Sequence, residues 1–161
     1  MAHSARVASR DGALRVGVTR AGVRAPVSGE GLADAVRAVL RAEGIRDAMI
    51  SVTLLSPTAM ARLNRRHLAH AGATDVISFG FSPVPDAGVV GDIYLCPDVA
   101  GANARAAGCG VREELLRLVV HGTLHVLGWD HPASAARERS PMWQRQERLL
   151  AAVLRRRARR P

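Results

Sequence analysis

The sequence predicts an α+β domain in which a mixed sheet of about four strands packs against helices. Segments with the short, β-branched pattern of strands alternate with segments of helical periodicity along most of the 161 residues. The last two predicted strands are joined without a helix, so they are expected to pair antiparallel, while strands joined by helices are expected to run parallel. The expected order is β-α-β-α-β-β-α-α-α.

The first half of the chain supplies two strands and two helices of this order. Residues 14–19, LRVGVT, alternate apolar and polar residues as a half-buried strand does. A helix is expected from about Ser28, because apolar residues then recur on one helical face until Gly44 can end it. Residues 48–56 are rich in apolar and β-branched side chains and predict a strand. Residues 56–68 begin with Ser-Pro, a strong helix start.

The third and fourth strands follow. Residues 74–81, TDVISFGF, predict a strand, and residues 91–96, GDIYLC, predict a shorter one. The segment between them, residues 81–91, contains two prolines and is expected to be a loop. Pro97 is expected to open a helix that runs to about Ala107.

Two further helices complete the predicted domain. Residues 111–127 are apolar nearly all round the helix, as in a buried helix. The last helix is expected to begin near Ser140 and to run into a basic tail, residues 155–161. Residues 1–12 are small and polar and predict a disordered leader, which leaves residues 13–154 as a single domain.

The charge and composition of the chain limit the kinds of partner that it is expected to bind. The net charge is +9, every basic residue is arginine, and aromatic residues make up only 3%. Such a positive field favours polyanions such as nucleic acid, or an anionic membrane surface. No apolar run is long enough to span a membrane and no signal peptide is evident, so a cytoplasmic protein with free Cys96 and Cys109 is expected.

The stretch HGTLHVLGWDH carries the candidate chemistry. His121 and His125 lie one turn apart on the predicted buried helix, where an unsatisfied polar group costs roughly 1–3 kcal/mol. Gly128 lets the chain reverse, and Pro132 favours an extended His131, so the third imidazole can return to the same point. Three histidines with one open position are typical of a catalytic zinc site. The alternative is two hydrogen-bonded core histidines and one on a surface turn.

A comparison with peptidase motifs limits the reactions that the predicted metal site is expected to catalyse. The spacing matches H-E-x-x-H-x-x-G-x-x-H of the metzincins, but Gly122 stands where those enzymes have their catalytic glutamate. A metallopeptidase is therefore disfavoured, while a zinc ion can still activate water without that glutamate. Asp130 is a candidate for orienting a ligand or transferring a proton, or it is equally a solvated turn residue.

The histidine block and a second block, LN followed by TDVISF and then GD, make the chain similar to the YbeY family over residues 14–155. The family signature is close to H-G-x-L-H-L-x-G-Y-D-H. The resemblance implies a zincin-like fold with one Zn2+ held by His121, His125 and His131. It also implies hydrolysis of single-stranded RNA, maturation of the 3′ end of small-subunit rRNA, and ribosome quality control.

The sequence departs from this family at one position. The family usually carries an arginine a few residues after LN, where it is taken to contact RNA phosphate, and that position here is Leu68. Either a neighbouring residue replaces this arginine or the phosphate is held differently. Arg66 is the candidate to replace it near the reacting phosphate, and Arg65 is a candidate for substrate binding.

Polar residues of the predicted third strand are further candidates for substrate binding. Thr74, Asp75 and Ser78 are expected to line the cleft, although Asp75 is equally suited to bind backbone amides. Because aromatic residues are scarce, RNA affinity is expected to come mainly from arginine–phosphate contacts and to fall with added salt.

The sequence therefore predicts a zinc-dependent endoribonuclease whose partners are single-stranded RNA, rRNA and the small ribosomal subunit, with neither a membrane nor DNA as a partner. Two alternatives stay open. One is a zincin-type metallopeptidase. The other is a non-catalytic ribosome-binding protein with a structural zinc, which a fourth protein ligand would indicate.

Overall fold

One mixed sheet organises the fold. The computed structural model describes residues 13–68, 71–84 and 88–160, and within them the strand order is β1-β2-β4-β3. β1 (Leu14–Thr19) runs parallel to β2 (Ala48–Leu54), and β2 runs parallel to β4 (Gly88–Leu95). β3 (Val76–Val84) pairs antiparallel with β4. The predicted α+β class, the mixed sheet and the antiparallel last pair are confirmed. The expectation that strands joined by a helix run parallel is wrong for β2 and β3, which run in opposite directions with β4 between them.

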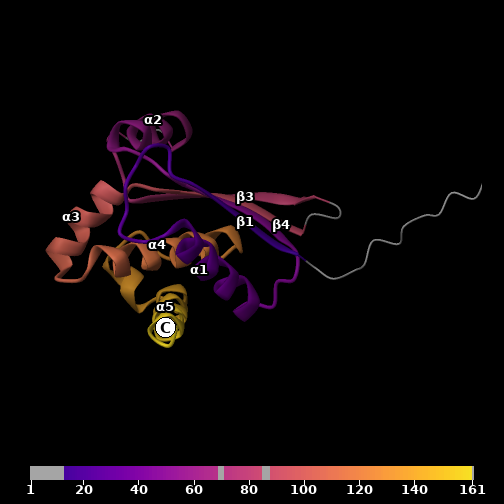
Figure 1. Cartoon of the computed structure of the whole chain (residues 1–161). Coiled ribbons are helices and arrows are strands. Elements are labelled where there is room, and N and C mark those ends of the chain that lie inside the picture. The colour runs from indigo at the N-terminus through magenta and orange to yellow at the C-terminus, as the bar shows by residue number, and fades with distance from the viewer. Residues whose placement is uncertain (1–12, 69–70, 85–87, 161) are drawn as a thin grey trace, which may run out of the picture.

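Helices lie on both faces of this sheet. In the described residues they are α1 (Gly29–Ala42), α2 (Pro57–Leu68), α3 (Pro97–Ala107), α4 (Val111–Val126) and α5 (Pro141–Ala158), with a 3-10 turn at Ala135–Arg139. Figure 1 shows α2 on one face of the sheet and α1, α4 and α5 on the other. The hydroxyls of Ser28, Ser56 and Ser140 accept hydrogen bonds from backbone N–H groups in the first turns of α1, α2 and α5. The helix starts predicted at these serines are confirmed.

The prediction for the β3–β4 connection was wrong. Residues 81–91 were expected to be a loop, but β3 continues to Val84 and β4 already begins at Gly88. The pairing register shifts between Phe81 and Val84, and β3 is one of the two edge strands of the described sheet. An edge strand with an irregular register tolerates Pro83, which cannot donate a ladder hydrogen bond. The start of this strand was also misplaced, because Thr74 and Asp75 precede it.

The predictions for the two ends of the chain have different outcomes. The leader predicted for residues 1–12 lies outside the described residues. At the other end α5 continues to Ala158, so Arg155, Arg156 and Arg157 of the predicted basic tail are helical. No helix in the described ranges combines the length and apolar character needed to cross a membrane.

Glycines let α4 approach the sheet closely. Gly80 of β3 and Gly91 of β4 face each other in register. A Cβ built on Gly91 would lie 2.5 Å from a methyl group of Val126, and one on Gly80 would lie 3.0 Å from the Val126 carbonyl oxygen. Four residues earlier, a Cβ on Gly122 would lie 2.9 Å from Cγ2 of the fully buried Ile93. Gly122 and Val126 therefore form the side of α4 that faces the sheet.

Replacing Gly122 with alanine is expected to destabilise the protein by on the order of 1–3 kcal/mol, because the new methyl group overpacks a close helix–sheet contact. Gly101→Ala in α3 is the matched control, since the nearest atom to a Cβ there is 3.6 Å away and alanine is the better helix former. Denaturant unfolding of both variants measures the difference. Equal stability of the two variants would contradict this description of the α4 packing.

Candidate metal centre

The end of α4 and the turn after it bring three histidines together. One ring nitrogen from each of His121, His125 and His131 lies within 4.8 Å of the other two. His121 is buried and the other two are half-buried. The convergence predicted from the sequence is confirmed, and the group can bind a metal ion.

Packing against the sheet sets the direction of the first two rings. Gly122 and Val126 face the sheet, and His121 and His125 each precede one of them. One residue corresponds to a rotation of about 100° around a helix, so both imidazoles project together from a neighbouring side of α4. The glycine that replaces the peptidase glutamate is thus a packing residue in this fold.

A Schellman turn returns the third histidine. Gly128 has a φ of 93°, and its N–H donates to the carbonyl of His125 over 2.9 Å. The Trp129 N–H donates to the carbonyl of Leu124 over 3.0 Å, which completes the 6→1 and 5→2 pattern of this motif. The chain reverses within three residues, and His131 follows. The predicted role of Gly128 is confirmed.

Each histidine has its Nδ1 atom fixed by an oxygen acceptor. Nδ1 of His121 lies 2.6 Å from Oε1 of Gln146, Nδ1 of His125 lies 2.9 Å from the Trp129 carbonyl, and Nδ1 of His131 lies 2.9 Å from the Pro132 carbonyl. An oxygen acceptor holds the proton of a neutral imidazole on Nδ1. All three Nε2 atoms are then free lone-pair donors, the usual arrangement around a metal-ligating histidine.

The separation of two of these nitrogens fits a shared ion. Nε2 of His125 lies 3.2 Å from Nε2 of His131. With both protons on Nδ1, these two atoms have no hydrogen to share. Two ligands at the ordinary zinc–nitrogen length of 2.0–2.1 Å in a tetrahedron are about 3.3 Å apart. The nitrogens of His125 and His131 are therefore spaced as two ligands of one metal ion could be.

Within the described ranges the group contains three protein ligands. No carboxylate or thiol joins the three histidines there. Cys96 packs with Met60 and Ile77 in a separate apolar cluster. Cys109 lies beside Glu114, with Sγ 3.8 Å from a carboxylate oxygen. This composition is that of an open centre, in contrast to the closed four-ligand sites of structural zinc.

Burial and nearby positive charge favour the neutral forms of His121 and His125. Burial lowers the pKa of His121 to about 4, against the opposing hydrogen bond to Gln146. Burial also lowers the pKa of His125, which the hydrogen bond to Trp129 opposes. The positive charge of Arg137 adds to the lowering at both rings. A metal ion therefore meets little competition from protons at neutral pH.

Acid is expected to destabilise the metal-free protein. An unfolded histidine protonates near pH 6.5, whereas folded His121 does so near pH 4. Between these values the unfolded state binds more protons, so the free energy of unfolding falls as the pH drops from 6.5 to 4, by on the order of 3 kcal/mol. Denaturant unfolding in chelator from pH 7 to pH 4 measures this, and His121→Leu is expected to flatten the dependence. The same slope in both proteins would contradict the expectation.

A second layer of contacts holds the turn in place. The Trp129 indole N–H donates to Glu43 over 3.1 Å, and Arg145 of α5 donates to the other oxygen of the same carboxylate. Glu43 thereby connects the end of α1 with α5 and with the loop that contains Trp129. The carbonyl of Trp129 is the one that fixes the His125 ring. Sequence reasoning missed Glu43, Gln146 and Arg137, because each reaches the centre from a distant or irregular segment.

Asp130 caps the backbone next to the centre. Its Oδ1 accepts a hydrogen bond from the N–H of His131 over 2.8 Å, and the residue is exposed. The carboxylate is also among the charges that raise the pKa of His125. Asp130 thus contacts the backbone of the third histidine, and a role for it in orienting a ligand or transferring a proton stays a prediction.

The predicted arginines lie elsewhere. Arg65 and Arg66 are exposed on α2, which covers the face of the sheet opposite α4 (Figure 1). Leu68, at the position of the family arginine, is 44% exposed at the end of the same helix. Contact of these arginines with substrate stays a prediction.

The three polar residues predicted to line the cleft differ in their surroundings. Asp75 accepts hydrogen bonds from the N–H of Val76 and, through its other oxygen, from the side chain of Asn103. Thr74 donates to the same carboxylate over 3.4 Å. The structural role weighed for Asp75 therefore matches its contacts. Ser78 is half-buried and alternates with Ile77, so it lies on the face of β3 toward α4.

Fold and centre together define a class: an α+β protein in which three histidines at the end of a buried helix could bind a metal ion. A family model described as Endoribonuclease YbeY matches residues 24–154. The chain belongs to the YbeY family of endoribonucleases.

Individual relatives agree with this assignment. Endoribonuclease YbeY of Frankia casuarinae is 39% identical over 143 residues, which cover 78% of this chain and 70% of the relative. The protein of the same name from Mycobacterium tuberculosis is 40% identical over 113 residues, covering 64% of this chain and 63% of the relative. The solution structure of TM1509 from Thermotoga maritima is similar, with a TM-score of 0.57 and 27% identity, and covers 86% of this chain and 88% of that chain.

Proposed function

We propose that this protein is a zinc-dependent endoribonuclease that cleaves single-stranded RNA. Its substrate is the 3′ region of small-subunit rRNA, and it also serves ribosome quality control in the cytoplasm. Family membership supports the nuclease activity. The observation that supports the metal chemistry is the set of three Nδ1 contacts, which leave the Nε2 atom of each ring free, in a group whose ring nitrogens lie within 4.8 Å of one another.

The proposed roles follow the geometry of the centre. His121, His125 and His131 would hold one Zn2+. When bound, the ion would supply a Lewis acid for the phosphoryl oxygens and lower the pKa of water. Gln146, the Trp129 carbonyl and the Pro132 carbonyl orient the three rings, and Asp130 orients the backbone of His131. Ser78, Thr74, Arg65 and Arg66 are proposed to contact RNA.

Arg137 is the cation best placed to offset phosphate charge. It lies in the 3-10 turn shortly after His131, and its guanidinium stacks 5.5 Å from the centroid of the Trp143 ring. Its charge acts on both His121 and His125, whereas α2 carries Arg66 on the other face of the sheet. We therefore place Arg137 ahead of Arg66 as the residue that takes over from the family arginine at Leu68.

The two alternatives have weaker support. A metallopeptidase would need a general base at the position of Gly122, and this residue packs against Ile93 instead. A structural zinc would need a fourth protein ligand, which the described residues do not bring to the group.

Cleavage of a labelled single-stranded RNA by the purified protein tests the proposal. Cleavage is expected to stop in chelator, to return with added Zn2+, and to be slower on the same RNA annealed to a complement. Full-rate cleavage in chelator would remove the metal mechanism. Chelator-sensitive hydrolysis of casein without cleavage of RNA would favour the peptidase.

A further inference from the structure

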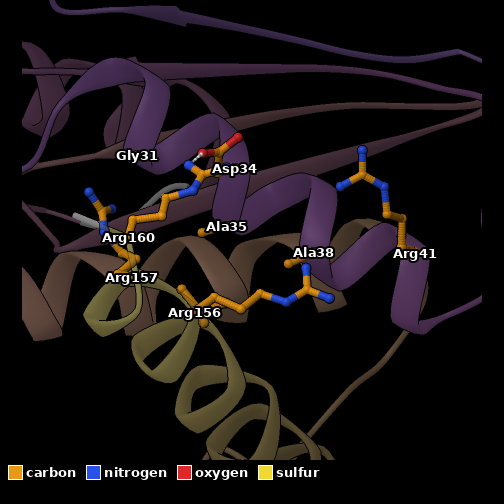
Figure 2. Close-up of a pocket in the computed structure, with 9 residues that line it drawn as sticks. Gly31, Asp34, Ala35, Ala38, Arg41, Arg156, Arg157 and Arg160 are labelled. Carbon is orange, nitrogen blue, oxygen red and sulfur yellow. Dashed lines mark hydrogen bonds and ion pairs between the residues drawn. The ribbon is translucent and has the colours of Figure 1, made fainter.

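A second concentration of positive charge lies on the side of the molecule formed by α1 and α5. A cavity of about 220 Å³ separates these helices, and its charged lining consists of Asp34, Arg41, Arg156, Arg157 and Arg160. Figure 2 shows Arg156 and Arg157 of α5 beside α1, and Arg160, which follows the helix, paired to Asp34. The lining carries four positive charges and one negative charge.

The carboxylates near this cavity are already engaged by other arginines. Asp34 pairs with Arg160 over 2.8 Å and with Arg37 over 3.4 Å. Glu30 pairs with Arg37 over 3.0 Å. Among the described residues no ion pair joins a carboxylate to Arg157. The lining therefore keeps an excess of positive charge, which the charge of Asp34 offsets only in part.

One side-chain donor of Arg157 lacks a hydrogen-bond acceptor among the described residues. Its Nη1 atom is buried and has no hydrogen-bond partner in the described structure. Burial, followed by the charge of Arg112, lowers the pKa of this guanidinium. A buried donor on a charged group without a partner is costly, and an anion that reaches it would remove that cost.

The position of the Arg157 guanidinium also favours a bound anion. The Arg157 guanidinium packs against Gly31, in the first turn of α1, where a Cβ would collide with it. The amino end of a helix carries the positive end of its dipole, which Glu30 in the same turn offsets only in part, so a cation there favours a further anion. Guanidinium groups bind both carboxylate and phosphate in a bidentate manner, and RNA, the proposed substrate, supplies phosphate.

We propose that the cavity between α1 and α5 binds a phosphate group of an RNA strand, with Arg157 as the central contact and Arg156 and Arg160 beside it. This inference rests on the proposed RNA substrate and adds a second contact point to it. Gln146, which fixes His121, and Arg157 are eleven residues apart on α5, or about 16 Å along the helix axis. That corresponds to about five stacked nucleotides, so one strand can span both sites.

The first test measures binding without cleavage. Fluorescence anisotropy in chelator, with a single-stranded RNA of about 12 nucleotides, gives the affinity of each variant. Arg157→Met is expected to weaken binding about tenfold and to reduce the slope of log K against log salt by about one. Arg155→Met is the matched control, because Arg155 lies two residues away on the same helix, about 200° around it, and does not line the cavity.

A second variant tests the position of the Arg157 guanidinium without changing the charge of the protein. Gly31→Ala leaves the net charge unchanged, but its methyl group displaces the Arg157 guanidinium from the first turn of α1. It is expected to weaken RNA binding as Arg157→Met does. Thermal unfolding of each variant checks that the fold is retained, and alanine in this helix is not expected to lower stability.

The outcomes are distinct. Equal RNA affinity for Arg157→Met and Arg155→Met would overturn the proposal. The proposal would also be overturned if inorganic phosphate stabilised the wild type but not Arg157→Met, while the two proteins bound RNA with equal affinity. The cavity would then bind a small phosphate ligand and not RNA. Loss of RNA binding in Arg157→Met and Gly31→Ala supports it. Failure of the proposed function would appear separately, as an absence of cleavage by the zinc-loaded wild type.

Discussion

Replacing His125 with alanine is expected to remove the bound metal ion and to lower the rate of RNA cleavage by about a thousandfold or more. The ring supplies one of three ligands, and its Nε2 lies 3.2 Å from that of His131. A Lewis-acid ion provides several kcal/mol of transition-state stabilisation, and each 1.36 kcal/mol corresponds to a factor of ten in rate. Metal content of the purified variant and single-turnover cleavage of a labelled RNA measure both effects.

His67→Ala provides the control for this variant. His67 is exposed on α2, where its ring lies 5.4 Å from that of Phe79. It is expected to keep a full complement of metal and close to the wild-type rate. A His125→Ala protein that retained the ion, or cleaved RNA at an undiminished rate without it, would be incompatible with a centre built from the three histidines.

Replacing Gln146 with leucine is expected to lower the affinity for the metal ion by about 10–100-fold. Gln146 is 1% exposed, and its Oε1 accepts the Nδ1 hydrogen of His121 over 2.6 Å. Leucine fills similar space but offers no acceptor, so the ring loses its fixed orientation and its buried N–H loses its partner. Competition with a chromophoric zinc chelator measures the affinity.

Two further variants distinguish orientation from general stability. Gln144→Leu makes the same change on the exposed side of α5 and is expected to leave the affinity unchanged. Gln146→Glu restores an oxygen acceptor and is expected to recover most of the affinity when the ion is bound, since carboxylates often orient metal-ligating histidines. If leucine and glutamate lowered the affinity equally, the hydrogen bond to His121 would not be the cause.

The parts of the fold and centre that sequence predicted are those set by local chemistry. Ser28, Ser56 and Ser140 mark helix starts through hydroxyl contacts within a few residues. The pairing of His121 and His125 on one helical side follows from their spacing, and the return of His131 follows from Gly128 at a positive φ. Such features need no knowledge of distant segments.

The remaining features depend on contacts across the fold. The extended β3–β4 pair contains Pro83, whose tolerance depends on the strand's position at the sheet edge. Gln146 is one polar residue in an amphipathic helix, and its contact with His121 joins positions 25 residues apart in the sequence. Arg137 acts on the centre from a 3-10 turn that no periodicity indicated. Arg157 gains its importance from the packing of α5 against Gly31.

The coordination of the ion in the zinc-loaded protein tests the central claim most directly. X-ray absorption at the zinc edge is expected to show three imidazole nitrogens at about 2.0–2.1 Å and one exchangeable oxygen, with one ion per chain. A sulfur ligand from Cys96 or Cys109, or a fourth imidazole or a protein carboxylate in place of the oxygen, would contradict it. The site would then be a closed structural zinc site without an open position for catalysis.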